Sequence, residues 1–379
     1  MLSRRASMTP ALALIALVSA CGPDATRPAR SPDAAALDRV TAEAAAQITV
    51  YASGFAFPRG LTFGPDGLLY VAEAGSGGTE FTTAHDCEQV VPPVGPYVNG
   101  PTGRISRVDT HGVRETVASG FPSASNKLGD VIGVADVAFV GQTLYALSAG
   151  GGCSHGSSHV PSGVARVESS GAWTTIADFS AWQRANPVAN PEEDDFEPDG
   201  TWYSMIEVRG SLIAIEPNHG EIVSVEPSTG AISRIVDVSA SQGHVVPTVS
   251  AFRHGDLYVS ALGVFPIVPG SENIYRVTLD GALTIVAHGF TTVLGIDFDR
   301  AGQMYVLESS PVAGFPIPGA GRVVQVDLAG NRTIIADHLI FPTALRFGPD
   351  GALYVSNKGY GPPESGEVLR IVLPTALED

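Results

Sequence analysis

The chain has 379 residues and a formal charge of −17 at pH 7, and 16% of its residues are charged. An acidic balance of this size argues against nucleic-acid binding and against a basic patch for anionic lipids, because both kinds of partner repel negative charge. After the first twenty residues no segment is long and apolar enough to span a bilayer, which argues against a transmembrane protein.

The first twenty residues have the pattern of a bacterial secretory signal, in which Arg4 and Arg5 precede the apolar stretch 11–18. Cys21 follows Val-Ser-Ala in the arrangement of a lipobox. We therefore expect residues 1–20 to be removed and Cys21 to carry a lipid that anchors an exported protein at the cell envelope, in the periplasm or at the cell surface. The alternative is an ordinary cleaved signal followed by a chance cysteine. Residues 21–46 are rich in Ala, Pro and Asp and are interpreted as a flexible tether.

A short phrase then recurs six times: an apolar strand, a tight polar turn and Leu-Tyr-Val or a close variant. The copies lie at Phe63–Val71, Phe139–Ala146, Val208–Ala214, Phe252–Val259, Phe298–Val306 and Phe347–Val355. Each copy is followed by a third strand that begins near a glycine, and usually by a fourth strand after a further turn. Six four-stranded units that cannot bury their apolar faces alone predict an all-β fold, a six-bladed β-propeller with antiparallel blades, over residues 47–374. Residues 375–379 are expected to form a tail.

The sixth repeat has three strands, because the chain ends soon after Ile371. Residues 48–55 have the same pattern as residues 284–290, which end the fourth repeat. The sequence therefore predicts that a strand from the N-terminal end completes the last blade and closes the ring, removing its exposed edges.

Loop lengths predict which face of the propeller binds ligands. Turns between strands one and two, and between strands three and four, are short hairpins. Nearly all long connections follow strand two or join blades, and these emerge on the same side of an up-and-down blade. They are residues 74–102, 149–162, 180–202, 262–272, 309–320 and 358–365.

Cys87 and Cys153 lie in the long connections of blades one and two, so an exported protein is expected to join them in a disulfide. The alternative is a pair of free thiols, or a metal site that also uses His85, His155 and His159. We favour a polar loop held by the disulfide over a metal site.

Carboxylates gather at two further places. Strand two ends in Glu73, Glu216, Glu308 or Asn357 in four repeats, where a ring of oxygens would suit one calcium on the axis. The alternative, which we favour, is that these side chains accept hydrogen bonds from backbone amides of neighbouring loops. Residues 192–199 hold six carboxylates but lack the spacing of a calcium loop, so a solvated linker is favoured there.

The starts of the innermost strands face the channel. They supply a set of mixed charge that matches no known catalytic constellation: Arg59, Asp136, Ser204, Thr248 and Thr343.

The pattern G-L-x-F-G-P-D-G-x-L-Y-V at residues 60–71 resembles NHL-type and SMP-30/gluconolactonase-like propellers. Residues 203–206, leading into 212–220, resemble the ScyD/ScyE family of secreted six-bladed propellers. The lactonase-like relatives imply a channel calcium held by Glu, Asn and Asp, with a carboxylate as general base. The nearest candidates here are Glu73, Asp136, Glu216 and Asn218. The full candidate channel or ligand-binding set is Arg59, Glu73, Asp136, Tyr203, Ser204, Glu216, Asn218, His219 and Thr248.

Our leading hypothesis is a lipid-anchored propeller that binds a small molecule, a glycan or a protein on its loop-rich face and has no chemistry of its own. The alternative is a calcium-dependent hydrolase or lactonase that uses the channel. A quinone-dependent sugar dehydrogenase lacks support from cofactor-binding residues. We expect a monomer that contacts the membrane through its N-terminal lipid alone.

Overall fold

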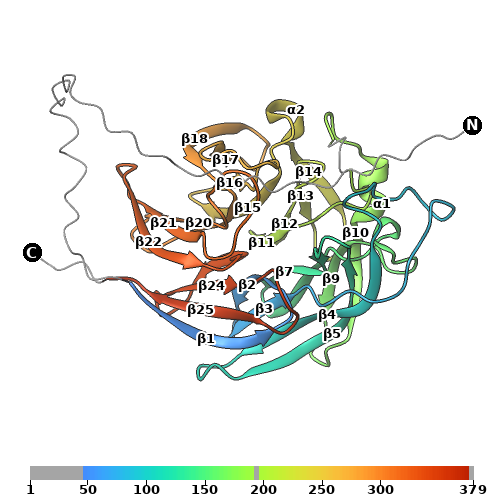
Figure 1. Ribbon diagram of the computed structural model, residues 1–379, viewed down its shortest axis with the longest axis horizontal. Helices are drawn as coiled ribbons and strands as arrows, with labels where there is room; N and C mark the ends of the chain where they lie inside the picture. Colours follow the sequence, from blue (N-terminus) through green and yellow to red (C-terminus); the bar gives the residue numbers. More distant parts are fainter. Residues whose placement is uncertain (1–45, 192–195, 375–379) are drawn as a thin grey trace, which may run out of the picture. The chain divides into compact units, whose positions relative to one another are not determined.

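The computed structural model describes residues 46–191 and 196–374 of the chain. Within them, six antiparallel sheets follow one another around a common centre as the blades of a β-propeller (Figure 1). The predicted fold is confirmed. Residues 1–45 and 375–379, which include the expected signal, lipidated Cys21 and tail, lie outside the described part.

Five blades contain four strands each and blade 1 has a short fifth strand in addition; their bounds follow in chain order. Blade 1 contains β2 (Pro58–Phe63), β3 (Leu69–Glu73), β4 (Val98–Val108) and β5 (Arg114–Ser125), with a short fifth strand, β6 (Val131–Ile132). Blade 2 contains β7 (Val134–Val140), β8 (Thr143–Ser148), β9 (Gly163–Val167) and β10 (Trp173–Asp178). Blade 3 contains β11 (Ser204–Val208), β12 (Ser211–Glu216), β13 (Glu221–Val225) and β14 (Ile232–Asp237).

The second half of the ring repeats this plan. Blade 4 contains β15 (Pro247–Arg253), β16 (Asp256–Ala261), β17 (Glu272–Val277) and β18 (Leu283–Phe290). Blade 5 contains β19 (Val293–Phe298), β20 (Met304–Glu308), β21 (Gly321–Val326) and β22 (Arg332–Leu339). Blade 6 contains β23 (Ala344–Phe347), β24 (Leu353–Asn357), β25 (Gly366–Val372) and, from the N-terminal end, β1 (Gln47–Phe55).

The recurring phrase forms the framework of each blade. In blades 1 and 6 its Gly-Pro-Asp-Gly turn ends in Gly67 and Gly351, whose positive φ angles of 76° and 78° favour glycine. The Leu-Tyr-Val part forms β3 and β24, in which every residue is buried. A strand buried on both faces needs a neighbouring blade on each side, which is why the repeat is stable only as part of the ring.

The tyrosine of the phrase packs against the next blade. Its ring meets, edge to face, the phenylalanine that begins the following copy of the phrase, at 4.9–5.0 Å between ring centres. The pairs are Tyr70 with Phe139, Tyr258 with Phe298, Tyr305 with Phe347, and Tyr354 with Phe63. Because the last pair joins blade 6 to blade 1, the same contact also closes the ring, and these tyrosines serve in packing.

The predicted closure is confirmed. Strand β1 pairs antiparallel with β25, from Gln47 opposite Val372 to Phe55 opposite Gly366 (blue beside red in Figure 1). Phe55 is fully buried. The edge of the last blade is therefore covered by a strand from the other end of the chain.

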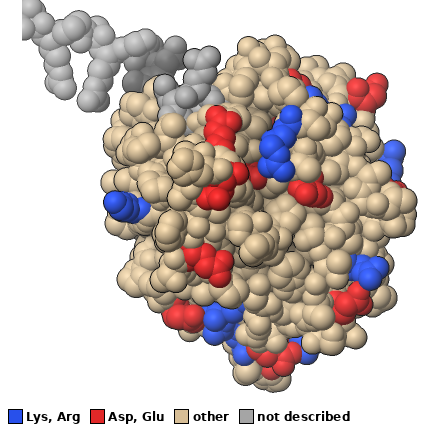
Figure 2. Space-filling model, turned by 90° about the vertical axis from the view of Figure 1, so that its right-hand side faces the viewer, with Lys and Arg blue, Asp and Glu red and all other residues tan. Residues whose placement is uncertain are grey.

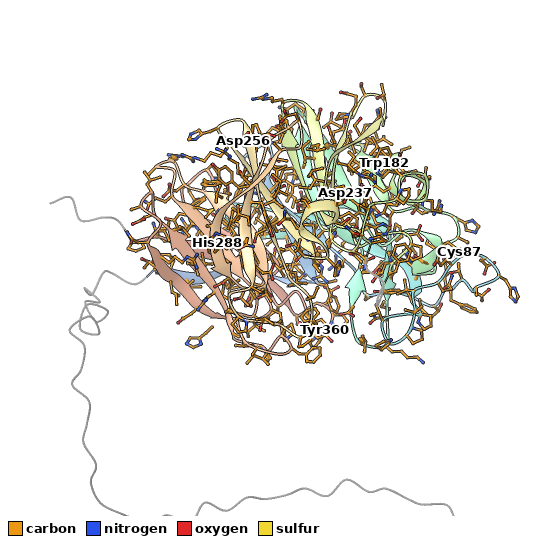
Figure 3. The ribbon with its side chains drawn as sticks, turned by 90° about the horizontal axis from the view of Figure 1, so that it is seen from above. Cys87, Trp182, Asp237, Asp256, His288 and Tyr360 are labelled. Carbon is orange, nitrogen blue, oxygen red and sulfur yellow. A yellow bond between two sulfur atoms is a disulfide. The ribbon has the colours of Figure 1, made fainter. Side chains whose placement is uncertain are left out.

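Long connections and short hairpins emerge on opposite faces, as the topology of the blades requires. The connections after the second strands and between blades carry η2 (Cys153–His155), α1 (Phe179–Ala185) and α2 (Ser239–Gln242). Figure 3 places Tyr360, in the connection after β24, on the opposite side of the molecule from Asp256, in the β15–β16 hairpin. Gln47 and Val372 both lie at the hairpin end of blade 6.

Charged side chains are scattered over the side of the propeller that Figure 2 displays, with acidic and basic groups often next to each other. No helix in the part of the chain described here is long and apolar enough to cross a membrane.

Candidate functional site

Tyr203 lies across the mouth of the axial channel. It immediately precedes β11 in blade 3, and its hydroxyl donates to the carbonyl of Thr343, at the start of blade 6, at 2.9 Å. Blades 3 and 6 are opposite each other in a ring of six, so this hydrogen bond spans the channel. Burial raises the pKa of the Tyr203 phenol, which keeps its proton in place for this bond.

Arg59, the second residue of β2, lies near Tyr203. Its guanidinium donates to the carbonyl of Gly359 at 2.5 Å and to that of Val131 at 2.9 Å. Burial lowers the pKa of Arg59, and Tyr203 and Asp130 oppose that change; a guanidinium nevertheless remains charged in proteins. The predicted channel residues Arg59 and Tyr203 therefore lie together, and both bind backbone carbonyls.

Asp136 is buried deeper in the channel. One carboxylate oxygen accepts from its neighbour Val137 N–H and the other from Met205 N–H in blade 3, both at 2.8 Å. The carboxylate also packs on Gly60, where a Cβ atom would lie 1.9 Å from it. Burial raises the pKa of Asp136 to about 6, although Arg346 and the two amides favour the charged form.

A small cavity of about 30 Å³ lies along the axis beside these residues. It is lined by residues in or just before the inner strand of every blade, among them Asp136, Tyr203, Ser204, Ser250, Leu294 and Arg346. Since about 10–15 Å³ of this kind of volume holds one water, the cavity has room for roughly two waters. Pockets that enclose a drug-sized ligand measure about 300–1,000 Å³, so this cavity is far too small for a sugar or a lactone ring.

The hydroxyls predicted to face the channel mostly join neighbouring blades. Thr248 donates to the carbonyl of Val293 at 2.6 Å, and Thr343 donates to the carbonyl of Pro58 at 2.7 Å. Ser204 differs, because its buried hydroxyl has no hydrogen-bond partner among the described protein atoms.

The acidic and amide side chains that end the second strands share one role. Each accepts a hydrogen bond from a backbone amide in the connection that leads into its own blade. The pairs are Glu73 with Ala56 N–H at 2.7 Å, Glu216 with Thr201 N–H at 2.7 Å, Glu308 with Thr291 N–H at 2.7 Å, and Asn357 with Ile340 N–H at 2.8 Å. This is the backbone-bonding interpretation of these positions that the sequence favoured over calcium.

The side chains of the candidate calcium set therefore already have protein partners. Glu73 also pairs with Arg104 at 2.7 Å and Arg114 at 3.1 Å. Glu216 also accepts from Asn218 N–H at 3.0 Å and from His219 N–H. Within residues 46–191 and 196–374, no three His, Cys, Asp or Glu side chains are grouped so that they could hold a metal ion.

Asn218 and His219 bind the segment that precedes blade 3. Asn218 accepts from Glu197 N–H at 2.9 Å, and the Nε2 atom of His219 lies 2.9 Å from the Glu197 carbonyl. Both side chains are buried. They position the 196–202 connection beside β12.

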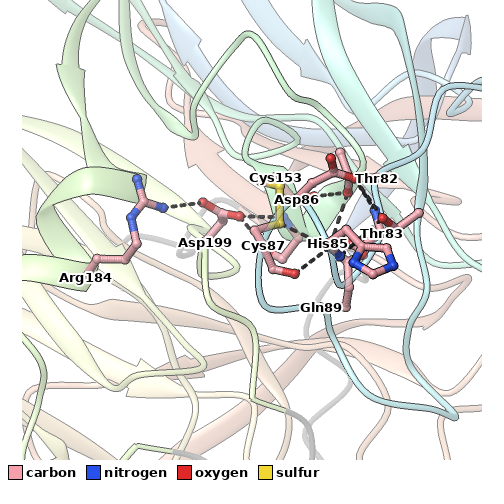
Figure 4. The surroundings of a disulfide bond; sticks show 10 residues. Thr82, Thr83, His85, Asp86, Cys87, Gln89, Cys153, Arg184 and Asp199 are labelled. Carbon is pink, nitrogen blue, oxygen red and sulfur yellow. Dashed lines mark hydrogen bonds and ion pairs between the residues drawn. A yellow bond between two sulfur atoms is a disulfide. The ribbon is translucent and has the colours of Figure 1, made fainter.

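The disulfide between Cys87 and Cys153 is confirmed (Figure 4). It joins the long connections of blades 1 and 2, at the opposite end of the molecule from His288 (Figure 3). His85 and His159 are exposed, whereas His155 is fully buried. The three histidines thus have different environments.

His155 forms a buried pair that the sequence analysis missed. Its Nε2 atom lies 2.8 Å from Glu197 and its Nδ1 atom 2.8 Å from the Gly151 carbonyl. Tyr97 donates to the same Glu197 at 3.1 Å. Burial lowers the pKa of His155, but Glu197 outweighs it, so the net effect raises the pKa. The only available signal was that His155 and Glu197 occupy connections on the same face.

The interpretation of residues 192–199 as a solvated linker is wrong for its described end. Glu197 and Asp199 are 4% and 1% exposed. Asp199 accepts from both the backbone and the hydroxyl of Ser154 at 2.7 Å and pairs with Arg184 at 3.2 Å (Figure 4). These carboxylates stabilise the loop cluster around the disulfide. Residues 192–195 lie outside the described part.

A further feature of the loop-rich face is a group of exposed apolar side chains on the connections of blades 4 and 5. Their side chains are 47–69% exposed, and we call them the apolar loop patch: Val264, Phe265, Val268, Phe315 and Ile317. The rings of Phe265 and Phe315 stack at 6.0 Å. Two backbone hydrogen bonds between Ile267 and Gly314, at 2.7 and 3.0 Å, tie the two connections together. The sequence signal was a Phe-Pro-Ile triplet in both connections.

No protein-family model matches this chain, and no curated protein matches it. Solved structures do match. A structural genomics protein of unknown function from Bacteroides thetaiotaomicron VPI-5482 is 11% identical, with a TM-score of 0.55, over 86% of this chain and 76% of that chain. A gluconolactonase from Xanthomonas campestris is 11% identical, with a TM-score of 0.52, over 87% of this chain and 90% of that chain.

A protein of Thermus thermophilus, provisionally assigned as an oxidoreductase of the glucose dehydrogenase type, is similar as well. It is 15% identical, with a TM-score of 0.52, over 86% of this chain and all of that chain. At such low identities the likeness is one of fold. The class that fold and comparisons define is the six-bladed β-propeller, with gluconolactonase-like propellers among its structural neighbours.

Proposed function

We propose that this protein is an exported, lipid-anchored propeller of the ScyD/ScyE type that binds a protein partner through its loop-rich face, without chemistry of its own. The observation that carries the proposal is the apolar loop patch. Phe265 and Phe315 are large aromatic side chains held in place by stacking and by the Ile267–Gly314 backbone bonds, yet they face solvent. Exposed clusters of this kind mark interaction sites more often than isolated apolar residues do.

The composition of the two connections supports a partner with an uncharged, apolar surface. Residues 262–271 and 309–320 contain no charged side chain, in a chain whose formal charge is −17. Five prolines lie in these connections, which reduces the conformational entropy lost on binding.

The shape of the channel favours a binding function over catalysis in the channel. Tyr203 lies across its mouth with Arg59 nearby, and both donate to backbone carbonyls. The cavity of about 30 Å³ is too small for an organic substrate.

The test is chemical cross-linking in the native envelope followed by purification of the protein and its partners. We expect the double variant Phe265→Ser/Phe315→Ser to lose its cross-linked partner at least about tenfold, since aromatic anchors in an interface contribute about 2 kcal/mol or more. Leu328→Ser is the matched control, because Leu328 is 80% exposed in the β21–β22 hairpin on the opposite face. An identical set of partners for the double variant and the wild type would contradict the proposal.

A channel hydrolase is the second candidate, and one observation favours it. Burial raises the pKa of Asp136 to about 6, which suits a general base near neutral pH. This candidate requires calcium in the purified protein, its loss in Glu216→Ala, and a lactone-hydrolysing activity that Asp136→Asn removes. Elemental analysis without a divalent metal, and a melting temperature that calcium does not change, would rule it out in favour of the binding function.

A further inference from the structure

Three hydrogen-bond donors line the axial cavity without an acceptor among the described protein atoms. They are the hydroxyls of Ser204 and Ser250 and the Nε atom of Arg346. The two serines are 8% and 4% exposed. They belong to β11, β15 and β23, the inner strands of blades 3, 4 and 6.

The acceptors nearest this cavity each accept one backbone or tyrosine hydrogen bond, and none of them accepts one from the three donors. The two oxygens of Asp136 each accept one backbone amide, from Val137 and Met205. The carbonyl of Thr343, at the mouth, accepts from Tyr203. A buried donor left without an acceptor costs about 1–3 kcal/mol. The cavity therefore presents three donors, one of them on a guanidinium, with which a small anion would form hydrogen bonds.

The volume of the cavity and the charges around it limit which ligands the cavity can hold. About 30 Å³ admits one small ion with at most one water. A calcium ion is disfavoured here, because Arg346 carries a positive charge and Asp136 is the one carboxylate among the described residues that line the cavity.

We propose that the axial cavity is a binding site for a small monovalent anion of the size of chloride or bromide, held by Arg346, Ser204 and Ser250. Arg346 supplies the charge and the serines supply hydroxyl donors. Tyr203 closes the loop-rich end, so the anion enters from the hairpin face, nearer to which Arg346 lies along β23.

Asp136 couples this site to pH. A charged Asp136 repels the anion, and a protonated Asp136 does not. The groups that face its carboxylate are Arg346 from β23, Tyr203 in front of β11 and the amides of Val137 and Met205. Because burial raises the pKa of Asp136 to about 6, protonation and anion binding assist each other. We expect bromide to bind about tenfold more tightly at pH 5 than at pH 8, a typical strength for coupling between two sites.

Bromide is the probe, because its anomalous scattering locates it in a crystal. In crystals of the mature wild-type protein soaked in sodium bromide at pH 5, we expect a peak between Arg346 and the two serine hydroxyls. Arg346→Gln should lose this peak and Arg346→Lys, which keeps the charge, should retain it. Arg166→Gln is the matched control, because Arg166 is a surface residue whose side chain is 50% exposed.

A solution measurement covers the case of a variant that does not crystallise. Sodium bromide should raise the melting temperature of the wild type more at pH 5 than at pH 8, relative to sodium sulfate at equal ionic strength. Arg346→Gln should lose this difference. Water alone in the cavity, an adventitious ion only, or an equal bromide peak in Arg346→Gln would overturn the proposal.

Discussion

At the scale of single residues, the pair of His155 and Glu197 is the feature whose energy depends most clearly on pH. His155 is fully buried and Glu197 is 4% exposed, so neither is well screened by solvent. Breaking one partner of such a pair leaves a buried charge uncompensated, which is much more costly than losing a surface ion pair.

The pair predicts how stability changes above neutral pH. The folded-state pKa of His155 is raised above 6.5, so its contribution is fully present below about pH 6.5 and is lost as the pH rises through the raised value. His155→Gln keeps a donor but cannot titrate. We expect it to cost about 2 kcal/mol of unfolding free energy at pH 6.5 and progressively less towards pH 9.

Urea unfolding at several pH values from 6.5 to 9 measures this difference. Asp136 does not interfere in this pH range. Burial raises its pKa from 3.8 to about 6, so its contribution to stability is present at low pH and is lost as the pH rises through about 6. The exposed His85, substituted by Gln, is the control. Parallel stability curves for wild type and His155→Gln would contradict the assignment.

For single residues, the sequence predicted some contacts and not others. It predicted the Cys87–Cys153 disulfide, because that pairing depends on the exported setting and on two cysteines in neighbouring long connections. It placed Arg59 and Tyr203 at the channel but missed their partners. Arg59 binds a carbonyl 300 residues away, and Tyr203 binds one 140 residues away. Such contacts depend on how six blades meet, which no local pattern records.

At the scale of elements, β1 is a covalently remote part of blade 6. It pairs with β25 over almost its whole length and buries Phe55. The incomplete sixth repeat made this pairing predictable. By contrast, α1 and the apolar loop patch arise in connections whose lengths and compositions do not repeat, so the periodicity that predicted the blades does not extend to them.

Removal of β1 should destabilise the whole propeller. A protein that begins at residue 56 exposes one edge of β25 and loses the contacts of Phe55. We expect it to melt at least about 10 °C below the full mature chain, or not to fold, since each kilocalorie per mole lowers the melting temperature of a large domain by about 2–4 °C. A second protein that begins at residue 46 is the control and should melt as the mature chain does. Equal melting temperatures for both truncations would show that β1 does not close the ring.

At the scale of the whole molecule, the ring has no privileged starting point. The tyrosine–phenylalanine contact that joins one blade to the next also joins blade 6 to blade 1. Gln47 and Val372, close to the two ends of the described propeller, are directly paired. The fold class was predictable because six copies of one phrase allow few other arrangements, whereas the ligand was not, because the copies carry none of the functional residues.

A circular permutant tests this equivalence. Joining residue 372 to residue 47 by a short linker and opening the chain between Pro65 and Asp66, in an exposed hairpin, should give a protein that unfolds cooperatively within about 10 °C of the parent. Opening the chain between Val71 and Ala72, inside the fully buried β3, should prevent folding. Circular dichroism during thermal unfolding measures both. Failure of the first permutant, or equal stability of the two, would contradict the prediction.

The hydrogen bond from Tyr203 to Thr343 gives the ring a property that contacts between neighbouring blades do not supply. Contacts between adjacent blades follow the circumference of the ring. Such contacts alone do not hold two opposite blades at a fixed distance from each other. The Tyr203 hydrogen bond instead joins blades 3 and 6 directly across the axis. Moving blade 3 away from blade 6 must break this hydrogen bond. A partner bound to the connections of blades 4 and 5 pulls in a different direction. The Tyr203 hydrogen bond therefore ties two opposite blades together at the loop-rich end, and a partner on the connections of blades 4 and 5 binds beside this tie and leaves it intact.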